Sequence, residues 1–98
     1  MSKDPAKVAP HAYRVVFEDD RVRVLDHVLE PGEKTDMHHH PALVAVPITD
    51  GRYRFTLPDG EKAEAETKAG GASFAEAVDH ATENIFPGRT RIILVELK

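Results

Sequence analysis

The stretch Met37-His38-His39-His40-Pro41 decides how the fold of this chain is interpreted. If the stretch is extended, the side chains of His38 and His40 project from one face of a strand, about 6.6–6.8 Å apart along it, and His39 faces the other way. Two imidazoles at that separation can converge on one metal ion. Imidazole suits Fe, Mn, Zn, Ni and Cu, with the remaining ligands arriving from elsewhere in the fold. We therefore interpret this stretch as half of a site for a divalent transition metal.

A solvated loop or a polar strand edge would also account for three adjacent histidines beside a proline. The stretch follows Pro31-Gly32, a turn signal, and precedes the apolar run Leu43-Val44-Ala45-Val46, which is typical of a strand. Short motifs match many sequences by chance. The choice between the two interpretations depends on a third ligand elsewhere in the chain.

Length, charge and composition exclude several classes of protein. The 98 residues suffice for one domain with a single core. A net charge of −4 without a basic patch argues against nucleic acid and against an anionic membrane as partners. The absence of cysteine excludes disulfides, thiolate ligands and cysteine nucleophiles. Without an apolar signal-peptide core or a segment of membrane-spanning length, the sequence predicts a cytoplasmic protein.

Strand and turn signals alternate along most of the chain. Residues 1–12 carry two prolines and scattered charges, which predicts a loose N-terminal arm ahead of a single domain over residues 13–98. Apolar and β-branched segments then recur roughly every 8–12 residues between turn signals. Residues 61–68 would suit a helix by composition, but their position between two turns favours an outer strand. The pattern predicts an all-β fold, an antiparallel sandwich or barrel.

The segment Asp79-His80-Ala81-Thr82-Glu83-Asn84 supplies a third histidine. On a strand, His80 and Asn84 would share a face because they are four residues apart. Together, the two histidine segments resemble those of the cupin family, small double-stranded β-helix or jelly-roll domains. The first cupin motif runs Gly, five residues, His-x-His, three or four residues, Glu, six residues, Gly. The second opens with glycine, passes a Pro-x-Gly turn and closes with His, three residues, Asn.

The resemblance covers about residues 13–98 and implies a jelly-roll barrel with a metal site. Four positions fit the spacing of the first motif, and three fit the second. They are Gly32, His38, His40 and Gly51, and then Gly70, His80 and Asn84. The resemblance therefore implies that His38, His40 and His80 are the metal ligands.

The chain departs from the family pattern in both motifs. Val44 stands where the first motif has its glutamate ligand, and Ala75-Glu76-Ala77-Val78 replaces the Pro-x-Gly turn. By the strand parity that turns His38 and His40 inward, Val44 also points inward and lines an apolar wall. The resemblance thus implies a site with three histidines at most. Some cupins, including certain thiol and diketone dioxygenases, work with three histidines alone, and others have lost their metal.

Several other side chains have simpler interpretations. We expect His27 to be exposed or bonded to a partner, Glu76 to lie in a solvated loop, and Asn84 to fix a strand turn through hydrogen bonds. Core positions are expected for the aromatic residues Tyr53, Phe55 and Phe74.

Two functions of different classes follow from the three-histidine interpretation. A metal held by three neutral imidazoles keeps its double positive charge and open positions, which suits a dioxygenase or a Lewis-acid isomerase acting on a small chelating substrate. The alternative is a non-catalytic module that binds a small molecule or a metal, because the glutamate is missing and no acid/base residue is evident. No catalytic residue is identified. We also expect a homodimer, since the apolar segments 13–17 and 92–97 would otherwise leave exposed strand edges.

Overall fold

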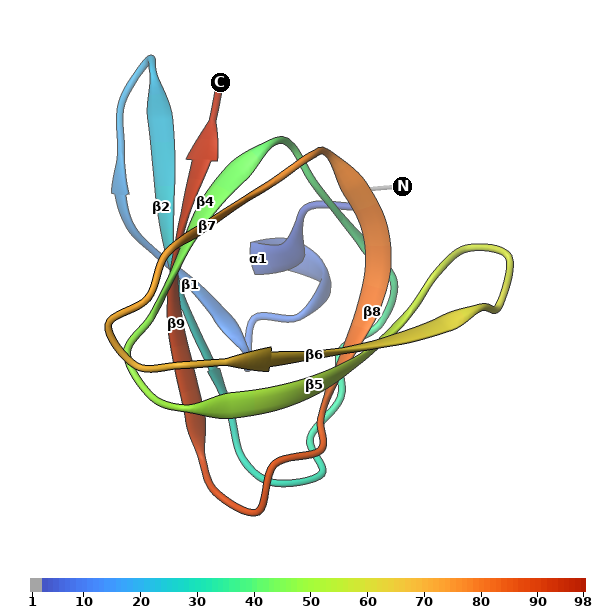
Figure 1. Cartoon of the computed structure of the whole chain (residues 1–98). Helices are drawn as coiled ribbons and strands as arrows, with labels where there is room; N and C mark the ends of the chain where they lie inside the picture. The colour runs from blue at the N-terminus through green and yellow to red at the C-terminus, as the bar shows by residue number, and fades with distance from the viewer. Residues whose placement is uncertain (1–2) are drawn as a thin grey trace.

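The computed structural model describes residues 3–98, and most of this part of the chain is β-structure (Figure 1). One short helix precedes a series of strands. In chain order the elements are α1 (Pro5–Val8), β1 (Tyr13–Glu18), β2 (Val22–Leu29), β3 (His38–His40), β4 (Leu43–Pro47), β5 (Gly51–Thr56), β6 (Lys62–Thr67), β7 (Ser73–Ala75), β8 (Val78–Asn84) and β9 (Thr90–Leu97).

The strands form two sheets that together enclose the interior of a barrel (Figure 1). One sheet has five strands in the order β1-β2-β9-β4-β7, and the other has four in the order β3-β8-β5-β6. All of the paired strands are antiparallel. The antiparallel all-β barrel predicted from the sequence is therefore confirmed. Within residues 3–98, no helix has the length and apolar character needed to cross a membrane.

Strand β9 illustrates how the sequence builds the core. Its buried side chains stand at alternate positions, Thr90, Ile92, Leu94 and Glu96, and they share the inner face of the sheet. Burying a leucine or isoleucine fully contributes about 1.5–3 kcal/mol. The buried apolar core consists of Ala9, Ala12, Tyr13, Leu25, Leu29, Leu43, Tyr53, Ile92 and Leu94.

Strand β6 is an outer strand, as predicted. It pairs with β5 alone, with Ala65 opposite Tyr53 and Ala63 opposite Phe55. The lysine and glutamate side chains of β6 are exposed. Charged side chains on an edge strand disfavour pairing with another chain. The charged residues that also suited a helix therefore protect this edge of the sheet from pairing with another chain.

The N-terminal segment differs from the expected loose arm. Residues 1–2 lie outside the described residues. Pro5, Ala9 and Ala12 are buried against the barrel. The Asp4 carboxylate caps α1 by accepting a hydrogen bond from the backbone N–H of Ala6 at 2.9 Å. The prediction is thus wrong for residues 3–12, because small apolar side chains and a helix cap hold the segment in place.

The side chain of Val44 does not point where strand parity predicted. Residues 41–42 separate β3 from β4, so the alternation does not continue from the histidine strand into the next one. Leu43 and Ala45 line the barrel cavity instead, whereas Val44 lies opposite Val95 on the outer face of the sheet. The predicted apolar wall exists, but it is made by leucine and alanine.

The aromatic residues divide between the core and the surface. Tyr53 is buried, and Phe55 is partly buried against the core, as predicted. Phe74 is 57% exposed, so its predicted core position is wrong. It lies on the short edge strand β7 opposite Val44, where no further strand of the sheet covers it.

The strand edges differ in part from those expected. Strand β9 lies in the middle of its sheet, so residues 92–97 are not an edge. Strand β1 is an edge strand, and its residues Val15, Val16 and Phe17 are 39%, 44% and 54% exposed. A homodimer that covers this edge stays a prediction.

We expect light scattering at micromolar concentrations to give the mass of a dimer. Val16→Lys should shift the mass to that of a monomer, because lysine on an edge strand disfavours strand pairing. The circular dichroism spectrum should not change, since Val16 is already exposed. A wild-type protein of monomer mass throughout this concentration range would contradict the prediction.

Candidate metal centre

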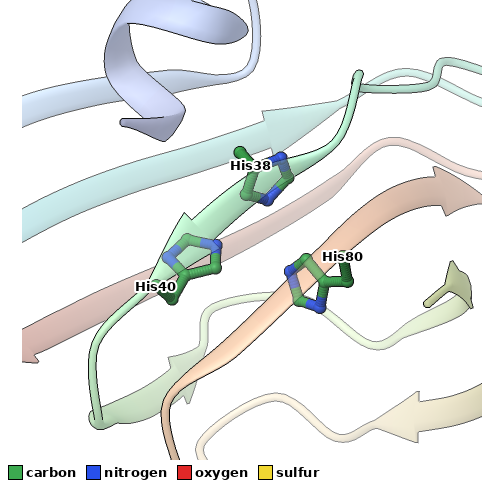
Figure 2. A group of neighbouring side chains, drawn as sticks. All are labelled: His38, His40 and His80. Carbon is green, nitrogen blue, oxygen red and sulfur yellow. The ribbon is translucent and has the colours of Figure 1, made fainter. Parts of the chain in front are cut away.

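Three histidines converge inside the barrel where β3 pairs with β8 (Figure 2). His38 lies directly opposite His80, so both side chains point to the same inner face. His40 follows two residues further along β3. The ring centroid of His38 is 4.8 Å from that of His40 and 4.9 Å from that of His80. The structure thus brings together the three residues that the sequence analysis singled out.

Hydrogen bonds orient two of the three rings. His38 Nδ1 donates to the backbone carbonyl of Asp36 at 2.8 Å, and His40 Nδ1 donates to the Glu96 carboxylate at 2.7 Å. Because Nδ1 carries the proton in both rings, the free lone pair is on Nε2. His80 Nε2 is buried and has no hydrogen-bond partner within residues 3–98. Each ring therefore has an Nε2 lone pair that can coordinate a metal, although that of His38 accepts a hydrogen bond from the Tyr13 hydroxyl.

This arrangement fits a metal ion. A buried polar atom without a partner costs about 1–3 kcal/mol, and coordination would supply the partner that His80 Nε2 lacks. One nitrogen of each ring lies within 4.8 Å of the other two. A tetrahedral ion with metal–nitrogen bonds of about 2.0–2.1 Å holds its ligand nitrogens about 3.4 Å apart, so modest ring rotations close the difference.

Burial keeps two of the three histidines neutral, His38 and His80. It lowers the pKa of His38 to about 4. Burial, together with the neighbouring His40 and His38, lowers the pKa of His80 to about 3. Only a neutral imidazole can coordinate a metal, so both rings are in the competent form at neutral pH.

Tyr13 and His27 pack behind the cluster. The Tyr13 hydroxyl lies 3.1 Å from His38 Nε2, to which it donates, and its ring stacks on His27 with 4.2 Å between centroids. Burial raises the pKa of Tyr13, so its phenol stays protonated. His27 Nδ1 donates to the backbone carbonyl of Ala12 at 3.0 Å. His27 is therefore bonded to a partner, as expected, although it is buried.

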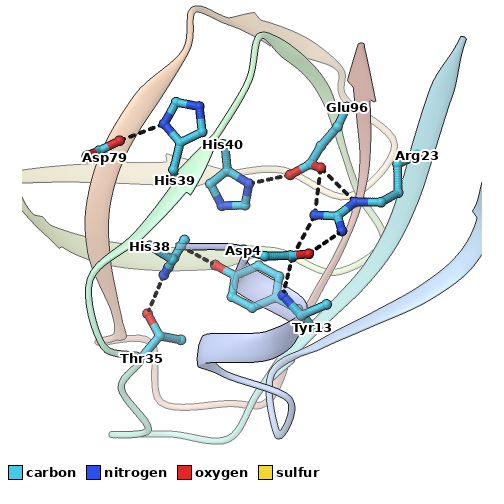
Figure 3. A network of polar contacts seen from close by, with 10 residues as sticks. Asp4, Tyr13, Arg23, Thr35, His38, His39, His40, Asp79 and Glu96 are labelled. Carbon is cyan, nitrogen blue, oxygen red and sulfur yellow. Dashed lines mark hydrogen bonds and ion pairs between the residues drawn. The ribbon is translucent and has the colours of Figure 1, made fainter. Parts of the chain in front are cut away.

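Glu96 is the residue of this site that the sequence analysis missed (Figure 3). Its buried carboxylate accepts hydrogen bonds from His40 Nδ1 at 2.7 Å and from Arg23 Nε at 3.0 Å. Because it contacts Nδ1, it orients the ring and leaves Nε2 free to coordinate. Its position on the inward parity of β9 was the available signal. Tyr13 offered no comparable signal.

The other residues considered from the sequence lie outside the cluster. His39 is exposed and bonds to the Asp79 carboxylate at 2.6 Å. Glu76 is exposed in the link between β7 and β8. The Asn84 amide donates to the backbone carbonyl of Leu29 at the end of β2, at 3.1 Å, and to that of Gly88 in the turn before β9, at 3.0 Å. It therefore fixes this turn, as expected.

A cavity of about 300 Å³ adjoins the cluster. Its lining residues on β6 and β7, Ala65, Ser73 and Ala75, are exposed, so the cavity opens between these two strands. His40 and His80 contribute to the inner wall. The deeper lining is mainly apolar and aromatic and includes Leu43, Ala45, Tyr53, Phe55, Ile92 and Leu94.

After metal has been removed with a chelator, the protein should lose stability steeply as the pH falls from about 6.5 toward 4. His27, His38 and His80 have folded-state pKa values of about 4, 4 and 3, against 6.5 for an unperturbed histidine. Below pH 6.5 the unfolded chain binds up to three protons that the folded chain does not. The free energy of unfolding should therefore decrease by about 3–4 kcal/mol per pH unit between roughly pH 6 and pH 4.5.

Urea unfolding at several pH values measures this slope. Because His80→Asn removes one of the three buried groups, its slope should be about a third smaller than that of the wild type. Equal slopes would show that His80 is not buried in its neutral form.

The chain was compared with known proteins by sequence and by structure. Its sequence matches no protein-family model and no curated protein. Its structure is similar to that of a cupin domain from Bordetella pertussis Tohama I, with 26% sequence identity and a TM-score of 0.80. That match covers 88% of this chain and 91% of the other.

Two further solved structures show the same architecture. An uncharacterized conserved protein with a double-stranded β-helix domain from Klebsiella pneumoniae is 21% identical, with a TM-score of 0.66 over 87% of this chain and 74% of the other. An RmlC-like cupin family protein from Methanocaldococcus jannaschii is 19% identical, with a TM-score of 0.67 over 88% of this chain and 78% of the other. With its antiparallel barrel and the histidines of both sequence motifs in one cluster, the chain is a single-domain cupin.

Proposed function

We propose that this cupin binds a divalent transition metal, Fe, Mn, Zn, Ni or Cu, through His38, His40 and His80, and presents it to a small-molecule ligand in the barrel cavity. The observation that carries the proposal is the convergence of three imidazoles on a buried point where His80 Nε2 lacks a hydrogen-bond partner among the described residues. Native proteins rarely leave buried polar atoms unpaired. A metal at this point would pair the Nε2 atoms of all three rings.

The charge around the cluster favours an anionic ligand. When bound, the metal would supply Lewis acidity and open positions for a chelating ligand or dioxygen. The three imidazoles bring no charge, and the Glu96 carboxylate behind His40 is shared with the Arg23 guanidinium. The site would therefore keep most of the positive charge of the metal. Oxygen or sulfur anions are the groups that such a charge attracts.

The cavity limits the size of the ligand, and Tyr13 can orient it. A volume of about 300 Å³ with a mainly apolar lining suits a small ligand with an apolar body. The Tyr13 hydroxyl now donates to His38 Nε2, one of the proposed coordinating atoms. Once that atom coordinates, the hydroxyl can donate to an anionic ligand atom beside it. Tyr13 would thus help to hold a chelating ligand at the cluster.

The proposed reaction is dioxygenation or Lewis-acid isomerisation of a small chelating substrate. One observation favours the alternative of a non-catalytic binding module. Besides the histidine ligands, the titratable side chains that line the cavity are Tyr13, His27, Tyr53 and Glu66. Tyr13 and His27 are buried and engaged in hydrogen bonds. Tyr53 is buried as well, and Glu66 is exposed at the rim. None of them is held in place as a general acid or base.

Metal analysis of purified variants tests the ligand set. Alanine substitution of His38, His40 or His80 should each remove most of the metal, because a three-ligand site does not tolerate the loss of one ligand. The matched controls are His39→Ala, next to two of the ligands but exposed, and His11→Ala, which is also exposed and whose ring bonds to the backbone carbonyl of Lys34. Equal losses in ligand and control variants would indicate adventitious surface binding and contradict the proposal.

Oxygen consumption distinguishes an enzyme from a binding module. The ferrous protein should consume oxygen with at least one member of a panel of small thiols and β-diketones, and His80→Ala should abolish the consumption. Tight binding of panel members without turnover, in the ferrous and the zinc-loaded protein alike, would favour the non-catalytic alternative.

A further inference from the structure

A chain of charged side chains connects the N-terminal segment, residues 3–12, to the histidine cluster (Figure 3). The Asp4 carboxylate accepts two hydrogen bonds from the Arg23 guanidinium, at 2.8 and 2.9 Å. Arg23 Nε donates to one oxygen of Glu96 at 3.0 Å. The other oxygen of Glu96 accepts from His40 Nδ1 at 2.7 Å. Four side chains from four different elements or links thus form one continuous path.

Burial makes each member of the path depend on the next. The side chains of Glu96, Arg23 and Asp4 are 3%, 15% and 26% exposed. A buried charge without its partner is strongly unfavourable, so Glu96 needs Arg23, and Arg23 needs a second carboxylate. Asp4 supplies that carboxylate. If it is neutralised, Glu96 alone balances the charge of Arg23, and the guanidinium draws the Glu96 carboxylate away from His40.

We infer that Glu96 is a positioning residue for His40 and that Asp4, by holding Arg23 against Glu96, makes the N-terminal segment part of the metal centre. This inference rests on the proposed function, since it concerns how tightly the cluster binds a metal. A carboxylate on the far nitrogen of a ligating histidine fixes its tautomer and ring orientation and makes the coordinating nitrogen a stronger donor.

Other contacts tie the same segment to the site. The backbone N–H of His39 donates to the carbonyl of Lys3 at 2.7 Å. The carbonyl of Ala12 accepts from His27 Nδ1 at 3.0 Å. Because coupling between two sites is reciprocal, a segment that strengthens metal binding must itself be held more firmly when the metal is bound.

The same sheet offers a matched control on its outer face. The Asp26 carboxylate is 7% exposed and accepts two hydrogen bonds from the Arg91 guanidinium, both at 2.9 Å. Arg14 lies 3.4 Å from the same carboxylate. The Asp26 carboxylate resembles that of Glu96 in burial and in its bonds to an arginine, although Arg91 is 47% exposed, and it contacts none of the three clustered histidines. Asp26→Asn therefore reports what the loss of a structural ion pair does by itself.

The test measures Zn²⁺ affinity by competition with a chromophoric chelator at pH 7.5, in the wild type and in Glu96→Gln, Asp4→Asn, the double variant and Asp26→Asn. Glu96→Gln should weaken binding about 10–100-fold, and Asp4→Asn about fivefold or more. The double variant should bind no more weakly than Glu96→Gln alone, because Asp4 acts through Glu96. Asp26→Asn should lower the melting temperature and leave the affinity unchanged.

Each other outcome has a definite meaning. Wild-type affinity in Asp4→Asn, equal losses in Asp4→Asn and Asp26→Asn, or additive losses in the double variant would overturn the inference and leave the proposed function intact. A wild-type protein that does not compete for Zn²⁺ would overturn the proposed function and this inference together.

If Glu96→Gln does not fold, amide hydrogen exchange of the wild type with and without Zn²⁺ tests the same inference. The amides of Val8 and Ala9 donate to the carbonyls of Asp4 and Pro5 within the segment. Their exchange should slow at least fivefold when Zn²⁺ binds. Unchanged exchange at these two amides, with slower exchange at His80, would show that the segment is not coupled to the cluster.

Discussion

The candidate metal centre depends on the register between β3 and β8, in which His38 lies directly opposite His80. A slip of one residue would turn the histidines of one strand out of the barrel. The register is set before β3 begins. The backbone N–H of Thr35 donates to the carbonyl of Thr82 at 2.8 Å, and the Thr35 hydroxyl accepts from the backbone N–H of Thr82 at 3.0 Å. Two short bonds in the approach to β3 therefore determine which side chains meet inside.

The barrel accommodates this many polar groups because most of them are neutral and bonded on one side. His27, His38 and His40 each use Nδ1 in a hydrogen bond at 3.0, 2.8 and 2.7 Å. The ring of His80 stacks on Phe55 with 4.9 Å between centroids. The buried Glu96 carboxylate is paired with the Arg23 guanidinium at 3.0 Å. Apolar packing therefore coexists with imidazole Nε2 lone pairs that can coordinate, which is the condition that a metal site requires.

Local pattern predicted most of the fold and the histidine set, because strand alternation and turn residues act over a few residues. Three features depended on residues far apart in the sequence and could not be predicted in this way. The link of residues 41–42 resets the parity between two strands, so Val44 faces outward and Ala45 inward. Glu96 is recognised as a site residue only when the inward parity of β9 and its distance to His40 are known. The burial of the N-terminal segment requires a surface made by strands from the whole chain.

The N-terminal segment also completes the barrel. Strands β1 and β3 are terminal strands of their respective sheets, and α1 contacts both of them. The segment therefore closes a seam between the two sheets (Figure 1), and the same residues lead through Ala12 and Tyr13 into the back of the histidine cluster. A chain of 98 residues has few other residues that could close the seam or support the histidine cluster. Barrel closure and the support of the site are thus carried by one short stretch, so a change that loosens it affects both together.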